Sequence, residues 1–205
     1  MLVCVALAVY LAGGEQSGSE SGSSSAAGAA VPTEVVQQDL NRDGILESIL
    51  IYEQNGVPER AEADTDQNGT VDLWVRYEGG DEVGEMAFDR DGDGQPEEWQ
   101  LFEAGVLTAR HQDTTRDGLP DMWILYEEDG AVLEMNRDAN ADGRPDLWSS
   151  YYPDASLRRA AYDTNSDGRP DLWINYNPEG EVASIETDSD ADGTPDQFTV
   201  PSEQQ

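Results

Sequence analysis

The sequence predicts an all-β protein, built as an elongated, solenoid-like array of seven β-hairpin plus calcium-loop repeats. Three observations lead to this prediction. A nine-residue acidic loop recurs seven times between residues 39 and 196, with a spacing of 25 residues and once of 24. Short apolar segments separated by Gly-rich turn signals follow the loops. No apolar pattern of helical period lasts longer than one turn, and Pro and Gly interrupt every unit.

Each unit consists of the acidic loop followed by two strand-like segments, for example residues 172–176 and 177–185. Dipeptides typical of hairpin turns separate the two segments in other units: Asn55-Gly56, Gly79-Gly80 and Asp129-Gly130. A single hairpin is unstable in water, so neighbouring units must stack on one another. A seven-bladed propeller is excluded, because a blade needs four strands and about 40–50 residues.

Aromatic residues occur in register with the loops. The position two residues after the last acidic residue of the loop holds all five tryptophans: Trp74, Trp99, Trp123, Trp148 and Trp173. Ile49 and Phe198 fill it in the terminal units, and a Tyr or Phe stands three residues later in the first six units. This regularity argues against a disordered acidic chain. In a regular strand, residues three apart point to opposite faces, so either both faces are covered or a bulge redirects one residue.

The acidic loop has the side chains of a metal-binding loop. Positions one, three, five and nine carry oxygen atoms, and Gly at position six permits a sharp turn without a Cβ clash. Calcium takes six to eight oxygen ligands, whereas magnesium needs a stricter octahedron. The near absence of Cys and His excludes the usual zinc and copper sites. We therefore expect about one calcium ion per repeat, with a backbone carbonyl at position seven as a further ligand.

The predicted metal ligands are the side chains at these four positions of the seven loops. They are Asp39, Asn41, Asp43, Glu47; Asp64, Asp66, Asn68, Asp72; Asp89, Asp91, Asp93, Glu97; Asp113, Thr115, Asp117, Asp121; Asp138, Asn140, Asp142, Asp146; Asp163, Asn165, Asp167, Asp171; and Asp188, Asp190, Asp192, Asp196.

The first half of the loop, Asp-x-Asp/Asn-x-Asp-Gly, resembles an EF-hand calcium loop. The Glu of position twelve is missing, since Val75, Gln100 and Ile124 stand there. The form Asp-x-Asn-x-Asp-Gly-x-Pro-Asp-Leu-Trp is closer to the loops of FG-GAP/VCBS-type repeats and thrombospondin type 3 repeats. The hairpin segment, Trp-x-x-Tyr-x-x-x-Gly, resembles MORN-type repeats. The calcium-loop resemblances imply an extracellular, calcium-stabilised adhesion or scaffold protein.

Composition limits the partners. The chain has 44 acidic and 11 basic residues among 205, giving a formal net charge of −33. This charge excludes electrostatic binding to nucleic acid or anionic lipid. It also opposes compaction unless cations are bound. The single histidine, His111, has no nucleophile partner evident in the sequence, so we do not expect an enzyme.

The chain divides into four segments. Residues 1–14 contain a short apolar run typical of a signal peptide, although no Lys or Arg precedes it. Residues 15–38 form a Ser/Gly/Ala-rich linker and lead-in, 39–200 the calcium-binding β array, and 201–205 a tail. Cys4 is the only cysteine, so a disulfide framework is excluded, and a lipid anchor on it is a less favoured alternative.

We therefore expect a secreted or cell-surface structural protein, stabilised by calcium and able to associate with itself head-to-tail or by sheet edges into a fibre. The alternative is a calcium-dependent adhesion module that binds a glycan or a surface protein through exposed aromatic residues.

Overall fold

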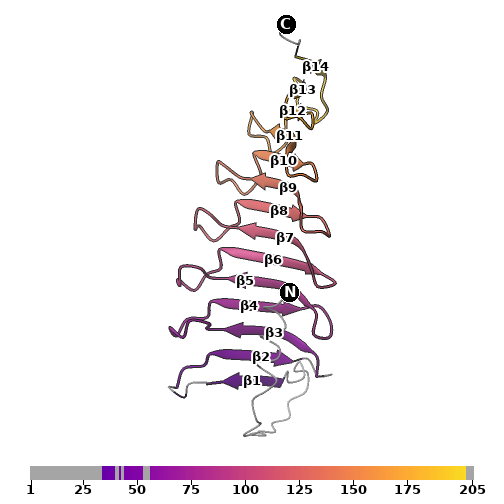
Figure 1. Ribbon diagram of the computed structural model, residues 1–205. Coiled ribbons are helices and arrows are strands. Elements are labelled where there is room, and N and C mark those ends of the chain that lie inside the picture. The colour runs from indigo at the N-terminus through magenta and orange to yellow at the C-terminus, as the bar shows by residue number, and fades with distance from the viewer. Residues whose placement is uncertain (1–33, 40–41, 43, 53–55, 202–205) are drawn as a thin grey trace, which may run out of the picture.

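The computed structural model is an all-β molecule (Figure 1). It describes residues 34–39, 42, 44–52 and 56–201. The expected signal peptide, residues 15–33 of the linker, and residues 202–205 of the tail lie outside the described residues, as do Asn41 and Asp43. None of the described segments is a helix long and apolar enough to cross a membrane.

Fourteen strands follow one another along the described chain. They are β1 (Glu34–Gln38), β2 (Ser48–Tyr52), β3 (Pro58–Ala63), β4 (Leu73–Tyr77), β5 (Val83–Phe88), β6 (Glu98–Glu103), β7 (Val106–Gln112), β8 (Met122–Tyr126), β9 (Val132–Arg137), β10 (Leu147–Tyr151), β11 (Leu157–Tyr162), β12 (Leu172–Tyr176), β13 (Val182–Thr187) and β14 (Gln197–Thr199).

These strands form one open antiparallel sheet whose order is the order of the chain, β1 to β14. Each strand pairs only with its neighbours in sequence, and the described strands make a single twisted layer (Figure 1). The expectation of an all-β fold is confirmed. Residues Glu34–Gln38, expected only as the lead-in to the array, form the first strand. The sheet therefore has two edge strands, β1 and β14.

A β-bulge occurs at the same place in six hairpins. In the β4–β5 pair, Arg76 lies opposite Glu85 but Tyr77 lies opposite Val83, so Gly84 is an additional residue on the returning strand. The bulge does not redirect Tyr77, because it lies on the other strand. Alternation along β4 therefore places Trp74 and Tyr77 on opposite faces of the sheet. The structure shows neither of the two arrangements expected from the sequence: the described strands form no second layer that would cover a face, and the bulge redirects neither residue. The tryptophans and tyrosines lie on different faces of one open sheet.

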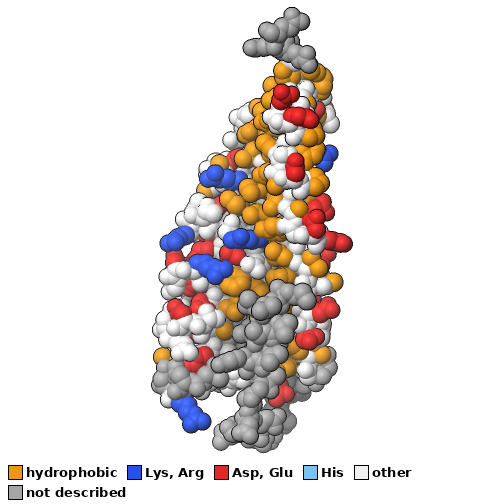
Figure 2. All heavy atoms as spheres, viewed as in Figure 1, with side chains coloured by type: hydrophobic (Ala, Val, Ile, Leu, Met, Phe, Trp, Pro, Cys, Tyr) orange, Lys and Arg blue, Asp and Glu red, His pale blue; other side chains and the backbone are white. Residues whose placement is uncertain are grey.

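One face carries the buried apolar cluster. Ala61, Ala63, Leu73, Val75 and Met86 form it, and Tyr77 and Val83 pack against it. No described side chain is less than 2% exposed among the larger residues, as expected for a sheet without a second layer. Figure 2 shows the hydrophobic side chains gathered in a band that runs along the sheet across successive strands.

The tryptophans lie on the opposite face, which we call the Trp face. Cross-strand pairing places Trp74 beside Ala87, Ala87 beside Trp99, and Trp99 beside His111. Farther along, Trp173 is 7% exposed, and the Arg159 guanidinium lies 5.7 Å from the centroid of its ring. The tryptophans thus form one row across alternate strands.

Candidate metal centre

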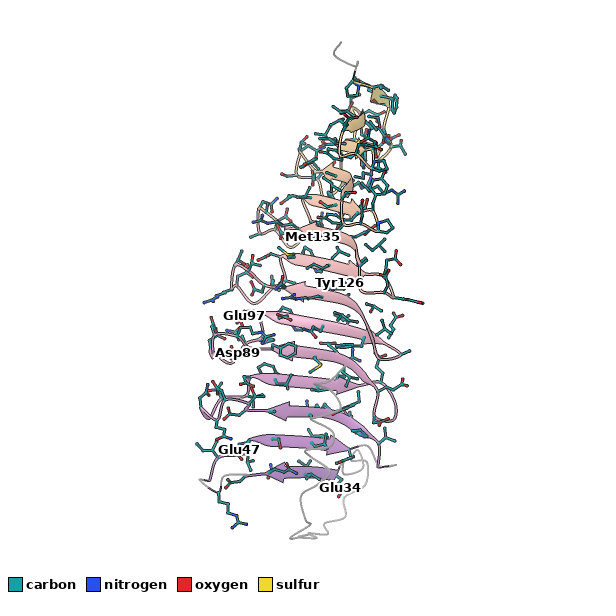
Figure 3. All side chains as sticks on the ribbon, in the orientation of Figure 1. Glu34, Glu47, Asp89, Glu97, Tyr126 and Met135 are labelled. Atoms are coloured by element: carbon teal, nitrogen blue, oxygen red, sulfur yellow. The ribbon has the colours of Figure 1, made fainter. Side chains whose placement is uncertain are left out.

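All seven acidic loops lie along one side of the sheet. Each connects an odd-numbered strand to the next even-numbered strand, so the loops gather at one end of the strands and the hairpin turns at the other (Figure 1). Figure 3 shows Glu47, Asp89 and Glu97 on the loop side and Tyr126 toward the turn side. We number the loops 1 to 7 by their residues: 39–47, 64–72, 89–97, 113–121, 138–146, 163–171 and 188–196.

The loops share one backbone conformation. The residue at position four has a positive φ in every loop: Arg42 (64°), Gln67 (61°), Gly92 (80°), Arg116 (62°), Ala141 (60°), Ser166 (62°) and Ala191 (58°). The Gly at position six also has a positive φ, between 87° and 93°. Left-handed conformations are unfavourable for residues other than Gly. In loops 3, 4 and 5 the amide of this residue donates a hydrogen bond of 2.6–2.7 Å to the position-one carboxylate, which stabilises the turn.

The carboxylate of position one organises each turn from inside. In loop 3, Asp89 Oδ2 accepts a hydrogen bond of 2.7 Å from the Gly94 amide. The same bond, from the position-six amide, occurs in all seven loops at 2.7–3.0 Å. Asp89 is 7% exposed. The residue at position one is buried in five of the seven loops, and its carboxylate lies at the centre of the turn.

The carboxylate of position nine closes the loop. Glu97 Oε2 accepts a hydrogen bond of 2.8 Å from the Arg90 amide at position two. In loop 4, Asp121 accepts bonds from the amide and the hydroxyl of Thr114, at 2.7 and 2.8 Å. Position nine therefore has a structural role in closing the loop, in addition to any contact with a metal.

Neighbouring loops are joined through their backbones. The Asp89 amide donates to the Asp72 carbonyl oxygen of loop 2 at 3.0 Å, and the Asp113 amide donates to the Glu97 carbonyl oxygen of loop 3 at 2.9 Å. Equivalent bonds connect all six pairs of successive loops. The hydrogen bonding of the sheet thus continues into the row of loops and joins each loop directly to the next.

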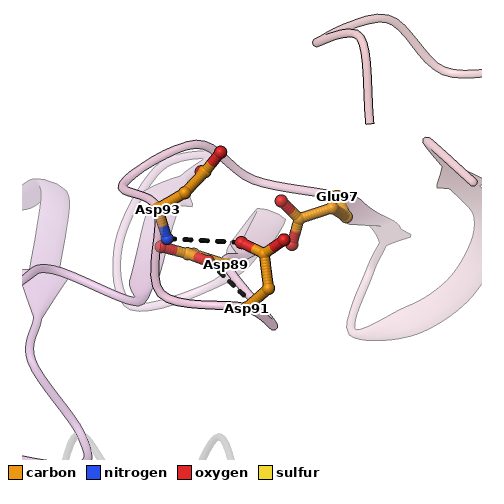
Figure 4. A group of neighbouring side chains, drawn as sticks. All are labelled: Asp89, Asp91, Asp93 and Glu97. Carbon is orange, nitrogen blue, oxygen red and sulfur yellow. Dashed lines mark hydrogen bonds between the residues drawn. The ribbon is translucent and has the colours of Figure 1, made fainter. Parts of the chain in front are cut away.

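Three loops bring their carboxylates together. Asp89, Asp91, Asp93 and Glu97 of loop 3 each offer an oxygen atom, and these atoms lie within 4.8 Å of one another (Figure 4). Loop 2 groups Asp64, Asp66 and Asp72, and loop 7 groups Asp188, Asp190 and Asp196. Oxygen atoms that bind one calcium ion at about 2.3–2.6 Å lie within roughly 5 Å of one another. The spacing of these three groups fits a single ion.

The other loops place fewer carboxylates together. Position three is Thr115, Asn140 and Asn165 in loops 4, 5 and 6, so these loops offer a neutral oxygen there. Among the described residues, no group of three carboxylates converges in these loops. In loop 5 the Asn140 side-chain amide donates to Asp146 at 2.8 Å. Asn41 and Asp43 of loop 1 lie outside the described residues. The acidic character of the loops therefore varies along the array.

A buried oxygen atom in loop 7 lacks a protein partner. Asp188 is 8% exposed and its Oδ2 accepts the Gly193 amide at 2.7 Å, but its buried Oδ1 has no hydrogen-bond partner. Asp39 Oδ1, at the same position in loop 1, is in the same situation. A buried carboxylate oxygen without a donor is costly unless a cation compensates it. A cation bound where the predicted ligands of loop 7 meet would compensate this oxygen.

The pKa values reflect these surroundings. Burial, the largest influence, raises the pKa of Asp89, but hydrogen bonds from the amides of Gly94 and Gly92 outweigh it and bring the pKa below its ordinary value. In loop 7 the charge of Asp192, followed by burial, raises the pKa of Asp190. Hydrogen bonding thus favours the charged form of Asp89, while the like charges of Asp190 and Asp192 repel each other. A bound divalent ion would relieve this repulsion.

Arginine contacts are a feature that the sequence reasoning missed. Arg116 of loop 4 forms an ion pair of 2.8 Å with Asp91 of loop 3, one of the predicted ligands. Glu98 lies between Arg110, at 3.0 Å, and Arg90, at 3.4 Å. The arginines at the variable loop positions four and seven were the signal available in the sequence. They place positive charge between neighbouring acidic loops.

The Trp face has two hollows. One of about 410 Å³ is lined by Trp74 together with Arg60, Glu62, Arg76 and Glu85. The second, of about 230 Å³, is lined by Trp148, Trp173, Asn136 and Arg159, among others. Burial lowers the pKa of His111, which lies between Trp99 and Trp123 on this face. Each hollow combines an indole ring with charged or amide side chains.

No family model and no curated protein matches this sequence. Among solved structures, the sheet is similar to part of a TarM mutant from S. aureus, crystallised with fondaparinux, alpha-GlcNAc-glycerol and UDP. The TM-score is 0.39 and the sequence identity 16%, over 55% of this chain and 21% of that one. A similarity of this extent establishes neither a shared fold nor a shared activity.

Proposed function

We propose that this chain is a non-enzymatic, extracellular structural repeat protein whose acidic loops each bind about one calcium ion. The observation that carries the proposal is the buried, unpartnered Oδ1 of Asp188, in a loop whose carboxylates converge. The shared hydrogen bond from position six to position one supports extending the proposal to all seven loops. Calcium is favoured over magnesium because each loop has four oxygen-bearing side chains, and calcium accepts six to eight oxygen ligands in variable geometry.

The magnitudes are consistent with calcium as part of the fold. Extracellular calcium modules bind with Kd values of roughly 10⁻⁴–10⁻³ M. Calcium at about ten times Kd stabilises each site by about 1.4 kcal/mol, so seven sites give about 10 kcal/mol, which is comparable with the stability of a whole domain. Such weak sites are filled only where calcium is abundant, which supports a secreted or cell-surface location. Seven ions add 14 positive charges and bring the net charge of −33 to −19.

Calcium titration tests this function. We expect about seven ions per chain by calorimetry, and a higher melting temperature in millimolar calcium than in EDTA or equal magnesium. Asp188→Asn removes the charge from a carboxylate whose buried Oδ1 has no hydrogen-bond partner, and it should reduce the stoichiometry by about one ion. Asp154→Asn is the matched control, because Asp154 is an exposed turn residue that bonds only Ser156. Identical melting curves with EDTA and with calcium would refute the proposal.

The hollows on the Trp face favour a second candidate, a calcium-dependent adhesion module that binds a glycan. An indole ring offers a flat apolar surface for a sugar ring, and Arg60 and Glu85 beside Trp74 could bond its hydroxyl groups. Soluble polysaccharides should then quench tryptophan fluorescence in calcium, and Trp74→Ala should weaken the quenching. Unchanged fluorescence across a panel of neutral and acidic polysaccharides would exclude this candidate.

A further inference from the structure

The sheet ends in two edge strands that no described strand covers. β1 pairs with β2 along one side only, and β14 pairs with β13 along one side only. Open edges pair readily with another strand, and many natural proteins protect them with charged side chains, Pro or bulges. All three residues of β14 are exposed, and Pro201 follows only after Val200. Protection of this edge is therefore weak.

Three of the four most exposed large apolar side chains among the described residues lie at these two edges, the fourth being Leu119 of loop 4. Phe198 is 65% exposed and Val200 60% at the β14 edge, and Val35 is 50% exposed at the β1 edge. Phe198 occupies the tryptophan position of its unit, yet Trp173, at the same position in the interior, is only 7% exposed. The difference arises because Trp173 has a strand on each side and Phe198 has one on a single side. A further strand against β14 would bury the apolar surface that is now exposed.

The strand directions fit a second copy of the chain. Successive strands are antiparallel and their number is even, so β1 and β14 run in opposite directions. The β1 strand of a second copy, placed against β14, would continue the alternation without interruption. A two-fold pairing of β14 with β14 also gives antiparallel strands, but it would leave both β1 edges exposed.

The register follows from the internal hairpins. In the β12–β13 pair, Trp173 lies opposite Glu186 and Asn175 opposite Ser184. The equivalent positions at the two edges are Phe198 on β14 and Val200 just after it, and Gln37 and Val35 on β1. This register places Val200 opposite Val35 and Phe198 opposite Gln37, on the Trp face. The three exposed apolar side chains therefore meet on one side of the new strand pair.

We propose that β14 pairs with β1 of a second copy in this register, so that copies associate head-to-tail into one continuous sheet. This inference rests on the proposed structural function, because bound calcium would reduce the repulsion between chains of charge −33. The two surfaces in contact are different, and each added copy leaves the same two edges free. Such a heterologous contact does not close and produces a filament.

Analytical ultracentrifugation of the full chain in millimolar calcium tests this pairing. We expect the average mass of the wild-type chain to rise with protein concentration. Val35→Lys and Phe198→Lys each place a charge in the new strand pair, so each variant alone should lose all species above the monomer. Because each variant keeps one intact edge, an equimolar mixture of the two should form dimers and nothing larger. Amides of residues 197–200 should exchange more slowly in the assembled wild-type protein.

Leu119→Lys is the control, because Leu119 is 62% exposed but lies in loop 4, far from either edge strand. It should assemble as the wild-type chain does. A chain that stays monomeric at every concentration while calcium still raises its melting temperature would overturn the pairing and leave the proposed function standing. Dimers of Phe198→Lys alone would show β1 pairing with itself and would also overturn the proposal, as would loss of assembly in the Leu119 control.

Discussion

At the scale of single residues, backbone conformation recurs where the side chains differ. Five hairpin turns have a residue with positive φ eight residues before the next acidic loop: Gly56 (79°), Gly105 (76°), Gly130 (86°), Ala155 (65°) and Gly180 (82°). Only Ala155 carries a Cβ atom in this left-handed conformation, which costs roughly 1–2 kcal/mol. Ala also restricts the unfolded chain more than Gly does, and this difference in conformational entropy offsets part of the cost. At this position of the turn, Ala155 is therefore the strained residue of the series.

Exchanging the residues at two of these turns should have opposite effects. We expect Ala155→Gly to leave stability unchanged or raise it by up to about 1 kcal/mol, because strain is relieved. We expect Gly180→Ala to lower stability by about 1–2 kcal/mol through strain alone, since no atom lies within 4 Å of the added Cβ. Urea denaturation of both variants, at one fixed calcium concentration, measures the sign of each change in stability. Equal destabilisation by both substitutions would contradict this explanation.

At the scale of one element, each loop is held at both ends by carboxylates. The position-one carboxylate binds the turn, and the position-nine carboxylate binds the amide that follows position one. Thr65, Thr114 and Thr164 at position two add a hydroxyl hydrogen bond to position nine at 2.7–2.8 Å. Asp121, the acceptor in loop 4, is only 4% exposed. The loops can therefore be partly formed before an ion binds.

Removing the Thr114 hydroxyl should weaken loop 4. Thr114→Val preserves the shape of the side chain but loses hydrogen bonds to a buried carboxylate, which should cost about 1.5–3 kcal/mol. Thr108→Val is the control, because the Thr108 hydroxyl lies 3.4 Å from the Leu101 carbonyl oxygen and loses little. Thermal denaturation in EDTA measures the stability of both variants. A change of similar size in the two variants would show that the hydroxyl of Thr114 does not hold the loop.

At the scale of the whole molecule, charge and topology act together. The formal net charge is −33 on a single-layer sheet, and each strand contacts only its neighbours in sequence. Repulsion along the row of loops is therefore opposed by local contacts between adjacent units. Ion pairs such as Arg116 with Asp91 offset only part of it.

Salt should stabilise the chain when calcium is absent. Raising sodium chloride from about 0.1 to 1 M shortens the Debye length from roughly 10 to 3 Å and screens repulsion between loops. We expect the melting temperature in EDTA to rise over this range. The rise should be much smaller in saturating calcium, because bound ions already neutralise the loops. A melting temperature that falls with salt in EDTA would show that the seven described ion pairs outweigh the repulsion.

The features that depend on short-range patterns could be predicted from the sequence. The Gly-rich turn dipeptides and the 25-residue period indicated the hairpins, and the alternation of oxygen-bearing residues indicated loops of one conformation. The period could not show whether the sheet closes, curls or stays open, because this depends on the accumulated twist of many strands. Similarly, the ion pair of Arg116 could not be predicted from the sequence, because it joins two different loops.

The β-bulge also could not be predicted from the sequence. The additional residue is Gly84 in one hairpin but Thr108, Leu133 and Arg158 in others, so it has no compositional signature. The three-residue spacing between Trp and Tyr could not show which face of the sheet each residue occupies. The register of the strands shows it.

The pairing of each strand with its sequence neighbours alone has a mechanical consequence. A force applied between β1 and β14 pulls across the strands, so it loads one pair of strands at a time rather than all hydrogen bonds in parallel. Units would then peel away in succession, and each unit of 25 residues would add roughly 80 Å of length as it extends. A tether of this kind yields gradually under tension and refolds locally when the load is removed, since each unit needs only the adjacent one as a template.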